Sequence, residues 1–222
     1  MRVVITGKKA FGAAIFDLCQ ERGDEIIAVW APAFTDDGGR RDRLRVKAET
    51  AGVPWHPAGS LSNANFPEGV EVLLAAHSTD FVSRPVRLAC SVGALGYHPS
   101  LLPLHRGRDA VRWAIKMGER VTGGTVYWLN DNIDAGDIAA QDFCFIRERD
   151  TAEELWRREL FPLGVRLFEL VLKRLDSGLI VAISQDQALA TWEPSWQRPP
   201  VHRPDLLMIG SGLDAYQVKK TR

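Results

Sequence analysis

Met1–Gly7 and the segment that follows it decide the fold class. The stretch reads M-R-V-V-I-T-G, a short apolar run closed by glycine, which is typical of a buried parallel strand. Ala10–Arg22 follows with apolar residues at helical spacing, and Gly23 stands where a helix commonly ends on a left-handed glycine. A buried strand followed directly by such a helix indicates an α/β protein.

The same alternation continues outward from this first unit. Strands are expected at Glu25–Trp30, Val53–His56, Val70–Ala76 and Gly93–Tyr97, and helices at Arg43–Ala51 and Ser83–Cys90. Strands that alternate with helices predict a doubly wound, mostly parallel, Rossmann-like sheet. Such sheets bind ligands at the carboxyl ends of their strands, so we expect the functional residues there.

The second half of the chain is less regular. We expect a helix at Asp109–Met117, a strand at Gly124–Leu129, an extended run ending at Phe145, and a last strand at Leu179–Ser184. Thr151–Glu154 is a capping box that opens a long helix, which Pro162 should kink or split. The prediction is one domain over residues 1–190 and an irregular tail, rich in Pro and Trp, over residues 191–222.

The charge balance limits the kinds of partner. Lys plus Arg and Asp plus Glu are equal at 28 each, so the formal net charge is zero. We do not expect a nucleic acid as a partner, because binding one usually requires a basic surface. The best basic cluster, Arg40–Lys47, is interpreted as a solvated loop that leads into a helix.

Cysteine usage and hydropathy indicate the compartment. Cys19, Cys90 and Cys144 lie far apart without metal-ligand spacing, so we predict buried, reduced thiols and no metal. No apolar run reaches the length of a membrane span, and the N-terminus leads directly into a strand. We therefore expect a cytoplasmic protein with no membrane partner.

Two polar stretches follow predicted strands. Gly96–Gly107 reads G-Y-H-P-S-L-L-P-L-H-R-G and places His98 at the carboxyl end of a buried strand, where the following proline stiffens the backbone. Asp131–Ile138 reads D-N-I-D-A-G-D-I and forms a polar turn between two apolar runs. Taken separately, His98 fits a structural histidine as well as a catalytic one, and the turn fits a solvated loop.

Together, the two stretches resemble the active-site signature of the folate-dependent formyltransferases. This family includes methionyl-tRNA formyltransferase, glycinamide ribonucleotide formyltransferase and the amino-sugar N-formyltransferases. The resemblance is closest to the N-terminal hydrolase domain of 10-formyltetrahydrofolate dehydrogenase. That branch also shares Phe11-Gly12, Gly123-Gly124 and Leu160-Phe161-Pro162 with this chain. The similarity covers about residues 1–191.

The resemblance implies a formyltransferase-type fold and a reaction. The donor, 10-formyltetrahydrofolate, carries its formyl group on N10 of tetrahydrofolate, and an amine or water attacks the formyl carbon. His98 is then expected to stabilise the oxyanion that forms. Asp134 is expected to orient the imidazole and to relay a proton through an ordered water.

The resemblance also implies where the donor binds. The pterin ring should lie in a slot between the loop after the fourth strand and the polar turn. The predicted donor-binding residues are Thr79, Asp80, Phe81, Val82, Asn130, Asp131, Asn132 and Ile133. Ordinary loop packing remains the alternative for Phe81 and Val82. The candidates on the acceptor side are Gly96, Ser100 and Arg106.

One position departs from the family pattern. The transferases carry Asn two residues before the catalytic His, where this chain has Gly96, and the dehydrogenase-type hydrolase domain also lacks that Asn. We expect Gly96 to leave space beside His98 for water, a bulkier acceptor or a carrier arm.

Three functions therefore stay open. The first is transfer of the formyl group to an unidentified small or carrier-linked acceptor, and the second is hydrolysis of the donor to formate and tetrahydrofolate. The third is folate binding without turnover, against which the presence of both His98 and Asp134 argues. The tail, with Trp192 and Trp196, is a candidate homodimer contact.

Overall fold

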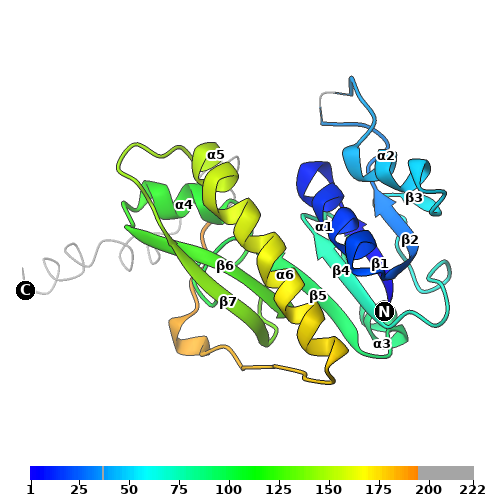
Figure 1. Cartoon of the computed structure of the whole chain (residues 1–222). Coiled ribbons are helices and arrows are strands. Elements are labelled where there is room, and N and C mark those ends of the chain that lie inside the picture. The colour runs from blue at the N-terminus through cyan, green and yellow to red at the C-terminus, as the bar shows by residue number, and fades with distance from the viewer. Residues whose placement is uncertain (37, 195–222) are drawn as a thin grey trace, which may run out of the picture.

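A single mixed sheet forms the centre of the molecule (Figure 1). The structure is a computed structural model that describes residues 1–36 and 38–194. Within these residues the strands are β1 (Arg2–Gly7), β2 (Glu25–Ala31), β3 (Trp55–Pro57), β4 (Val72–Ala76), β5 (Gly93–His98), β6 (Val121–Trp128) and β7 (Ile138–Phe145). Their order across the sheet is β3-β2-β1-β4-β5-β6-β7.

The first five strands are parallel and the last two are not. β1 pairs in parallel with β2 and β4, β2 with β3, and β4 with β5. β6 runs antiparallel to β5, and β7 antiparallel to β6. This arrangement confirms the predicted α/β fold with a mostly parallel sheet, and β6 and β7 form its antiparallel margin.

Helices cover both faces of the sheet. They are α1 (Lys9–Arg22), α2 (Arg43–Thr50), α3 (Arg84–Ala89), α4 (Ala110–Lys116), α5 (Ala152–Leu155) and α6 (Phe161–Asp176), with a π-helical turn η1 (Trp156–Leu160) and a 3-10 turn η2 (Gln187–Leu189). Alternate residues of β1 point to opposite faces: Val3 and Ile5 join the core under α1, α2 and α6, whereas Val4 joins the core under α3. The fold is doubly wound in this sense.

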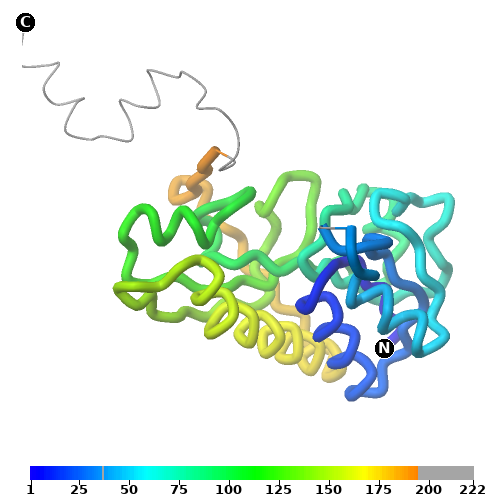
Figure 2. The backbone as a smooth tube through the Cα atoms, turned by 90° about the horizontal axis from the view of Figure 1, so that it is seen from above, coloured from blue at the N-terminus to red at the C-terminus, as the bar shows by residue number. Residues whose placement is uncertain are grey.

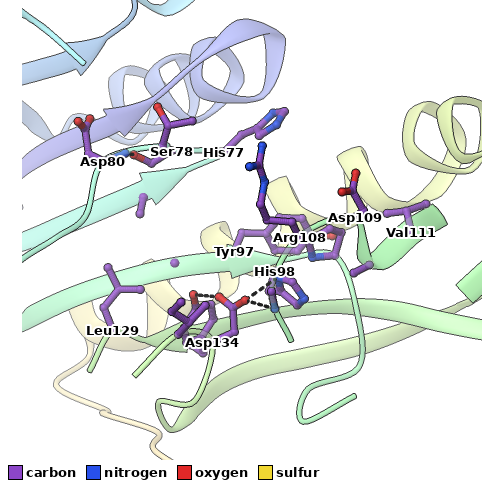
Figure 3. A pocket seen from close by; sticks show the side chains of 18 of the residues that line it. His77, Ser78, Asp80, Tyr97, His98, Arg108, Asp109, Val111, Leu129 and Asp134 are labelled. Atoms are coloured by element: carbon purple, nitrogen blue, oxygen red, sulfur yellow. Dashed lines mark hydrogen bonds and ion pairs between the residues drawn. The ribbon is translucent and has the colours of Figure 1, made fainter. Parts of the chain in front are cut away.

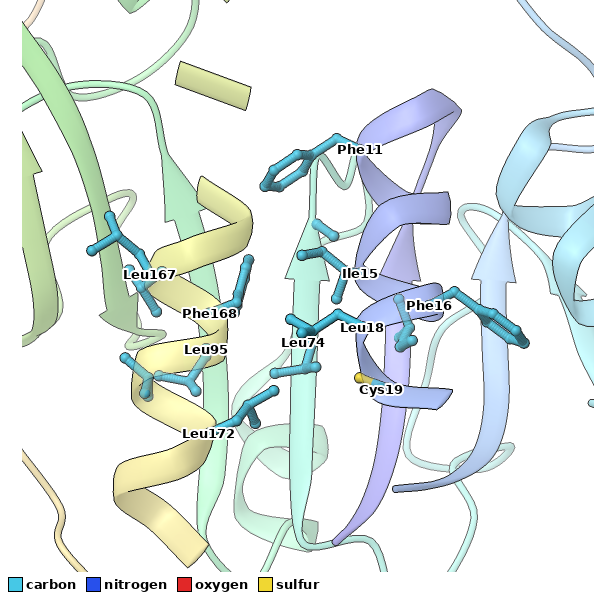
Figure 4. Packing of buried hydrophobic residues seen from close by; sticks show 14 of the residues in the cluster. Phe11, Ile15, Phe16, Leu18, Cys19, Leu74, Leu95, Leu167, Phe168 and Leu172 are labelled. Carbon is cyan, nitrogen blue, oxygen red and sulfur yellow. The ribbon is translucent and has the colours of Figure 1, made fainter. Parts of the chain in front are cut away.

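The larger core lies where α1 and α6 meet over the sheet. Figure 4 shows Phe11 and Ile15 of α1 and Phe168 of α6 directed toward each other above Leu74 and Leu95 of the strands. In the view from above, α6 runs alongside α1 (Figure 2). Burying each of these side chains contributes about 1.5–3 kcal/mol, so this core fixes the strands whose carboxyl ends bear the candidate site.

The long C-terminal helix is interrupted, as Pro162 predicted. Thr151 and Glu154 form the reciprocal capping box, and α5 passes through the π-turn η1 into α6, where Pro162 is in the first turn. Proline has no N–H to donate to the preceding turn. Separately, the carbonyl of Leu160 accepts a hydrogen bond from the Tyr97 hydroxyl at 2.7 Å, which anchors the helix beside His98.

The predicted strand at Leu179–Ser184 is wrong. This segment is extended but pairs with the sheet only through an isolated bridge between Ile183 and Ile138. Leu179, Ile180 and Ile183 are all more than half exposed, so the apolar run buries too little surface to be held as a strand. Its apolar character alone suggested a strand.

Two smaller predictions are confirmed. The basic cluster leads into α2, where Asp42 caps the helix and Arg41 and Arg45 bind Glu49 near the surface. Cys19, Cys90 and Cys144 are buried free thiols, and burial raises the pKa of each. No helix among the described residues is long and apolar enough to cross a membrane.

Candidate active site

A cleft of about 820 Å³ opens at the carboxyl ends of β1, β4 and β5. The loops after these strands, the β6–β7 turn and the start of α5 line it, contributing among others Lys8, His77, His98, Arg108, Asp134 and Trp156. Figure 3 shows the side chain of Asp134 directed toward His98. Arg108 and His77 lie close to each other on the opposite side of the cleft. The size is that of a pocket for a small molecule or cofactor.

His98 is the last residue of β5 and is buried. Its Nε2 lies 2.6 Å from the carbonyl oxygen of His105. A carbonyl only accepts, so Nε2 must hold a proton and donate it. The other ring nitrogen, Nδ1, lies 3.5 Å from Oδ2 of Asp134. The imidazole is therefore fixed in one orientation, with Nδ1 directed toward the carboxylate.

Asp134 lies in the β6–β7 turn with a left-handed backbone, φ 50°. Its Oδ2 accepts a hydrogen bond from the Gly107 N–H at 2.7 Å, and its Oδ1 accepts one from the Tyr127 hydroxyl at 2.6 Å. Burial, and then the charge of Asp134, raise the pKa of Tyr127 well above its usual value, so this hydroxyl keeps its proton. Two donors thus hold the carboxylate beside His98.

Gly96 lines the cleft, but the space that a side chain would enter at this position is occupied. It pairs with Tyr127 across the sheet. A Cβ at Gly96 would lie 2.8 Å from Leu129 Cδ2 and 3.2 Å from Cε1 of the Tyr127 ring. The space that the Gly96 side chain would take is therefore filled from β6 and the residue after it. Tyr127 and Leu129 themselves line the cleft.

The loop after β4 borders the cleft, but its members differ in what they contact. Phe81 is 71% exposed at the cleft, whereas Val82 lines the cleft but is mostly buried in the core under α3. The Asp80 carboxylate accepts hydrogen bonds from the Thr6 hydroxyl and the Gly59 N–H. Thr79 also lines the cleft. The hydrogen bonds of Asp80 therefore fix the loop, and Phe81 is the side chain that the loop exposes to the cleft.

The β6–β7 turn contributes three of its four predicted residues to the cleft. Asn130, Asn132 and Ile133 line it, and Ile133 is largely exposed. The carboxylate of Asp131 instead forms an ion pair with Arg87 of α3, and Asp131 is not among the residues that line the cleft.

Ser100 and Arg106 also lie behind the cleft and do not line it. Ser100 is fully buried, and its hydroxyl donates to the Leu104 carbonyl at 2.6 Å. Arg106 is buried with its guanidinium on the side-chain amide oxygens of Gln185 and Gln187. Both side chains shape the loop that follows His98.

Residues 1–167 match the family model described as formyl transferase. The chain belongs to this family. Among curated formyl-transferase relatives, the cytosolic 10-formyltetrahydrofolate dehydrogenase of Xenopus laevis is 29% identical over 87% of this chain. The match spans only 22% of that relative, so the chain corresponds to about a fifth of its length.

One further curated relative and one solved structure are also similar to this chain. The methionyl-tRNA formyltransferase of Anaeromyxobacter dehalogenans is 32% identical over 86% of this chain and 64% of its own length. The crystal structure of glycinamide ribonucleotide transformylase 1 from Symbiobacterium toebii superposes with a TM-score of 0.67 at 24% identity, covering 84% of this chain and 94% of that one. This last comparison shows the shared fold.

Three residues of this candidate site escaped the sequence analysis: Tyr127, His105 and Gln185. For Tyr127 the sequence offers a weak signal in the alternation of side chains along β6. This alternation places the Tyr127 ring on the same face of the sheet as Gly96, which has no side chain of its own there. His105 lies within the stretch that begins at Gly96, but nothing in its spacing reveals its contacts. Gln185 lies in an irregular segment and has no sequence signal. No group of three potential metal ligands occurs in the described part of the chain.

Proposed function

We propose that this chain binds 10-formyltetrahydrofolate and transfers its formyl group to a small or carrier-linked acceptor. The observation that supports this most is the His98–Asp134 pair that lines the cleft, in a chain that belongs to the formyl transferase family. The names of the curated relatives point to the same donor. The zero net charge argues against a nucleic acid as acceptor.

In this proposal the pterin lies between the loop after β4 and the β6–β7 turn. Phe81 and Ile133 expose apolar side chains at the cleft from these two segments. A flat, partly aromatic ring would bury both. Asn130 and Asn132 lie at the same end and offer side-chain and backbone groups to its polar edge.

The proposed chemistry assigns one role to each member of the pair. When an amine attacks the formyl carbon, the carbonyl oxygen becomes an oxyanion. His98 would stabilise it in its doubly protonated form, in which Nε2 keeps the proton that it donates to the His105 carbonyl and Nδ1 carries a second one. Asp134 would accept the amine proton directly or through a water. Breaking the bond from N10 to the formyl carbon then releases the formylated acceptor, and N10 takes up the proton to give tetrahydrofolate.

Hydrolysis is the second candidate, and Gly96 favours it. This chain has no side-chain amide at that position, and the ring of Tyr127 and Leu129 occupy the space around it. Water as the nucleophile needs little room. The same two residues would then act on water, and the products would be formate and tetrahydrofolate.

The deciding experiment gives the purified protein 10-formyltetrahydrofolate alone and follows tetrahydrofolate and formate. Formate release that His98→Ala abolishes would establish hydrolysis. Saturable binding without release would direct the search to amines, beginning with amino sugars and amino acids, and a formylated product would then establish transfer. Absence of both binding and release would refute the proposed donor.

A further inference from the structure

Residues 183–193, which we call the clasp, pass behind both loops that bear the candidate chemistry. At one end, Ile183 exchanges backbone hydrogen bonds with Ile138 of β7 at 2.8 and 3.0 Å. At the other end, Thr191 donates to the Pro103 carbonyl, and its own carbonyl accepts from the Arg106 N–H. The clasp therefore joins the β6–β7 turn to the loop after His98, although neither end belongs to the sheet.

Gln185 is the contact on the Asp134 side. Its side chain is 7% exposed and makes four hydrogen bonds. Its Oε1 accepts from Nε and Nη2 of Arg106, while its Nε2 donates to the carbonyls of Asp134 and Gly136 at 3.0 and 2.6 Å. One amide thus links the two loops and holds the left-handed backbone of Asp134 from behind.

Glu193 is the contact on the His98 side. Its Oε2 lies 3.0 Å from Nδ1 of His105 in an ion-pair contact, and Glu119 accepts a hydrogen bond from Nε2 of the same ring at 2.7 Å. The two carboxylates raise the pKa of His105 against the opposing effect of its burial. The carbonyl of His105 is the group that accepts the hydrogen bond from Nε2 of His98.

The position of Asp134 therefore depends on Gln185, and the position of His98 depends, through His105, on Glu193. The Thr191 hydroxyl adds a third contact by accepting the His105 N–H at 2.7 Å. Since a misplacement of about 1 Å can lower a rate about a hundredfold, contacts of this kind bear on turnover without touching substrate.

We propose that the clasp completes the active site, with Gln185 and Glu193 as positioning residues for Asp134 and His98. This inference rests on the proposed function for its kinetic consequence. Its geometric consequence is that the hydrogen bond from Nε2 of His98 to the His105 carbonyl is held in place, and this does not depend on the reaction.

The test uses Gln185→Glu and Glu193→Gln in the full chain. Gln185→Glu keeps the shape and the contact with Arg106 but loses the donors to the Asp134 and Gly136 carbonyls. Glu193→Gln removes the charge beside His105. We expect kcat to fall about tenfold to a hundredfold in each, with the KM for the formyl donor changed much less, because the clasp lies behind the cleft.

The matched control is Asp24→Asn. Asp24 is a buried carboxylate that binds the terminal amine and Arg22 at the amino ends of β1 and β2, the end of the sheet away from the cleft. Its loss should lower stability without changing kcat. If kcat of both clasp variants stays within about twofold of the wild type, or falls no further than in Asp24→Asn, positioning by the clasp is refuted.

NMR of the histidine rings tests the proposal about the clasp independently of the proposed function. In the wild type we expect a slowly exchanging Nε2 proton on His98, and in both clasp variants a shifted or faster-exchanging one. Unchanged His98 resonances would overturn the proposal, whether or not the protein turns over a formyl donor. If either variant fails to fold, Thr191→Val removes only the acceptor of the His105 N–H and is read in the same way.

Discussion

At the scale of single residues, the candidate chemistry depends on neighbours that hold His98 and Asp134. Tyr127 and the Gly107 N–H bind the two oxygens of Asp134, and the His105 carbonyl fixes the proton of His98 on Nε2. Neither side chain of the pair is free to turn without breaking one of these hydrogen bonds. Predictions at this scale therefore concern the neighbours.

Tyr127→Phe removes the hydroxyl on Asp134 and keeps the ring against Gly96. A hydrogen bond to a charged group contributes about 1.5–3 kcal/mol, so we expect kcat to fall about tenfold or more. Tyr97→Phe is the comparison, because it removes a buried hydroxyl that donates only to the Leu160 carbonyl. Steady-state turnover of both variants checks this, and equal effects would argue against a special role for Tyr127.

Gly96→Asn introduces the side chain that the transferases carry, into space that is already filled. Its Cβ would crowd Leu129 and the Tyr127 ring. We expect stability to fall by about 1–3 kcal/mol, as is usual for overpacking, and transfer not to improve. Adding Leu129→Ala should recover part of the loss. Denaturant unfolding of the single and double variants measures this, and a single variant as stable as the wild type would contradict it.

His105 predicts a specific dependence of stability on pH. Its folded-state pKa is raised, so its contribution is fully present below the unfolded value of about 6.5 and is lost as the pH rises through the raised value. Unfolding free energy should therefore decline across that window. In His105→Gln this decline should disappear. A parallel decline in both proteins would show that another group titrates.

At the scale of elements, α6 is the part that ties the sheet to the site. Phe168 is fully buried between α1 and the strands, whereas Leu170, two residues further along the same helix, is 40% exposed. The π-turn before α6 brings the Leu160 carbonyl to Tyr97, the residue before His98. Packing of α6 is thus expected to dominate stability.

Phe168→Ala should lower the unfolding free energy by about 3–5 kcal/mol, as loss of a buried aromatic ring does. Leu170→Ala on the same helix should cost less than ~1 kcal/mol because this side chain already contacts solvent. Urea denaturation of the two variants measures the difference. Similar losses would mean that α6 is not held by its buried face.

At the scale of the whole molecule, residues far apart in the sequence meet at one edge of a sheet. Parallel strands direct their carboxyl ends to the same side, so the loops after β1, β4 and β5 necessarily converge. The antiparallel β6 then brings Tyr127 against Gly96, and the turn after it brings Asp134 to His98. The cleft is a consequence of this topology.

The sequence by itself determined the alternation of strands and helices, the interruption at Pro162 and the prominence of His98 and Asp134. The first two follow from local periodicity and from the missing N–H of proline, which are properties of neighbouring residues. His98 and Asp134 stand out because the two short stretches that contain them resemble a known family. The strand at Leu179–Ser184 was predicted from an apolar run alone and was wrong, because such a run also occurs in a segment that pairs only at Ile183.

Only the tertiary structure decided how the space beside Gly96 is filled, which way the His98 ring is protonated, and that Gln185 reaches Asp134. These depend on contacts between residues that are distant in the chain, such as Gly96 with Tyr127 and Gln185 with Arg106. Such contacts leave no local pattern, because a side chain's burial and hydrogen-bond partners are set by the register of strands and the path of loops.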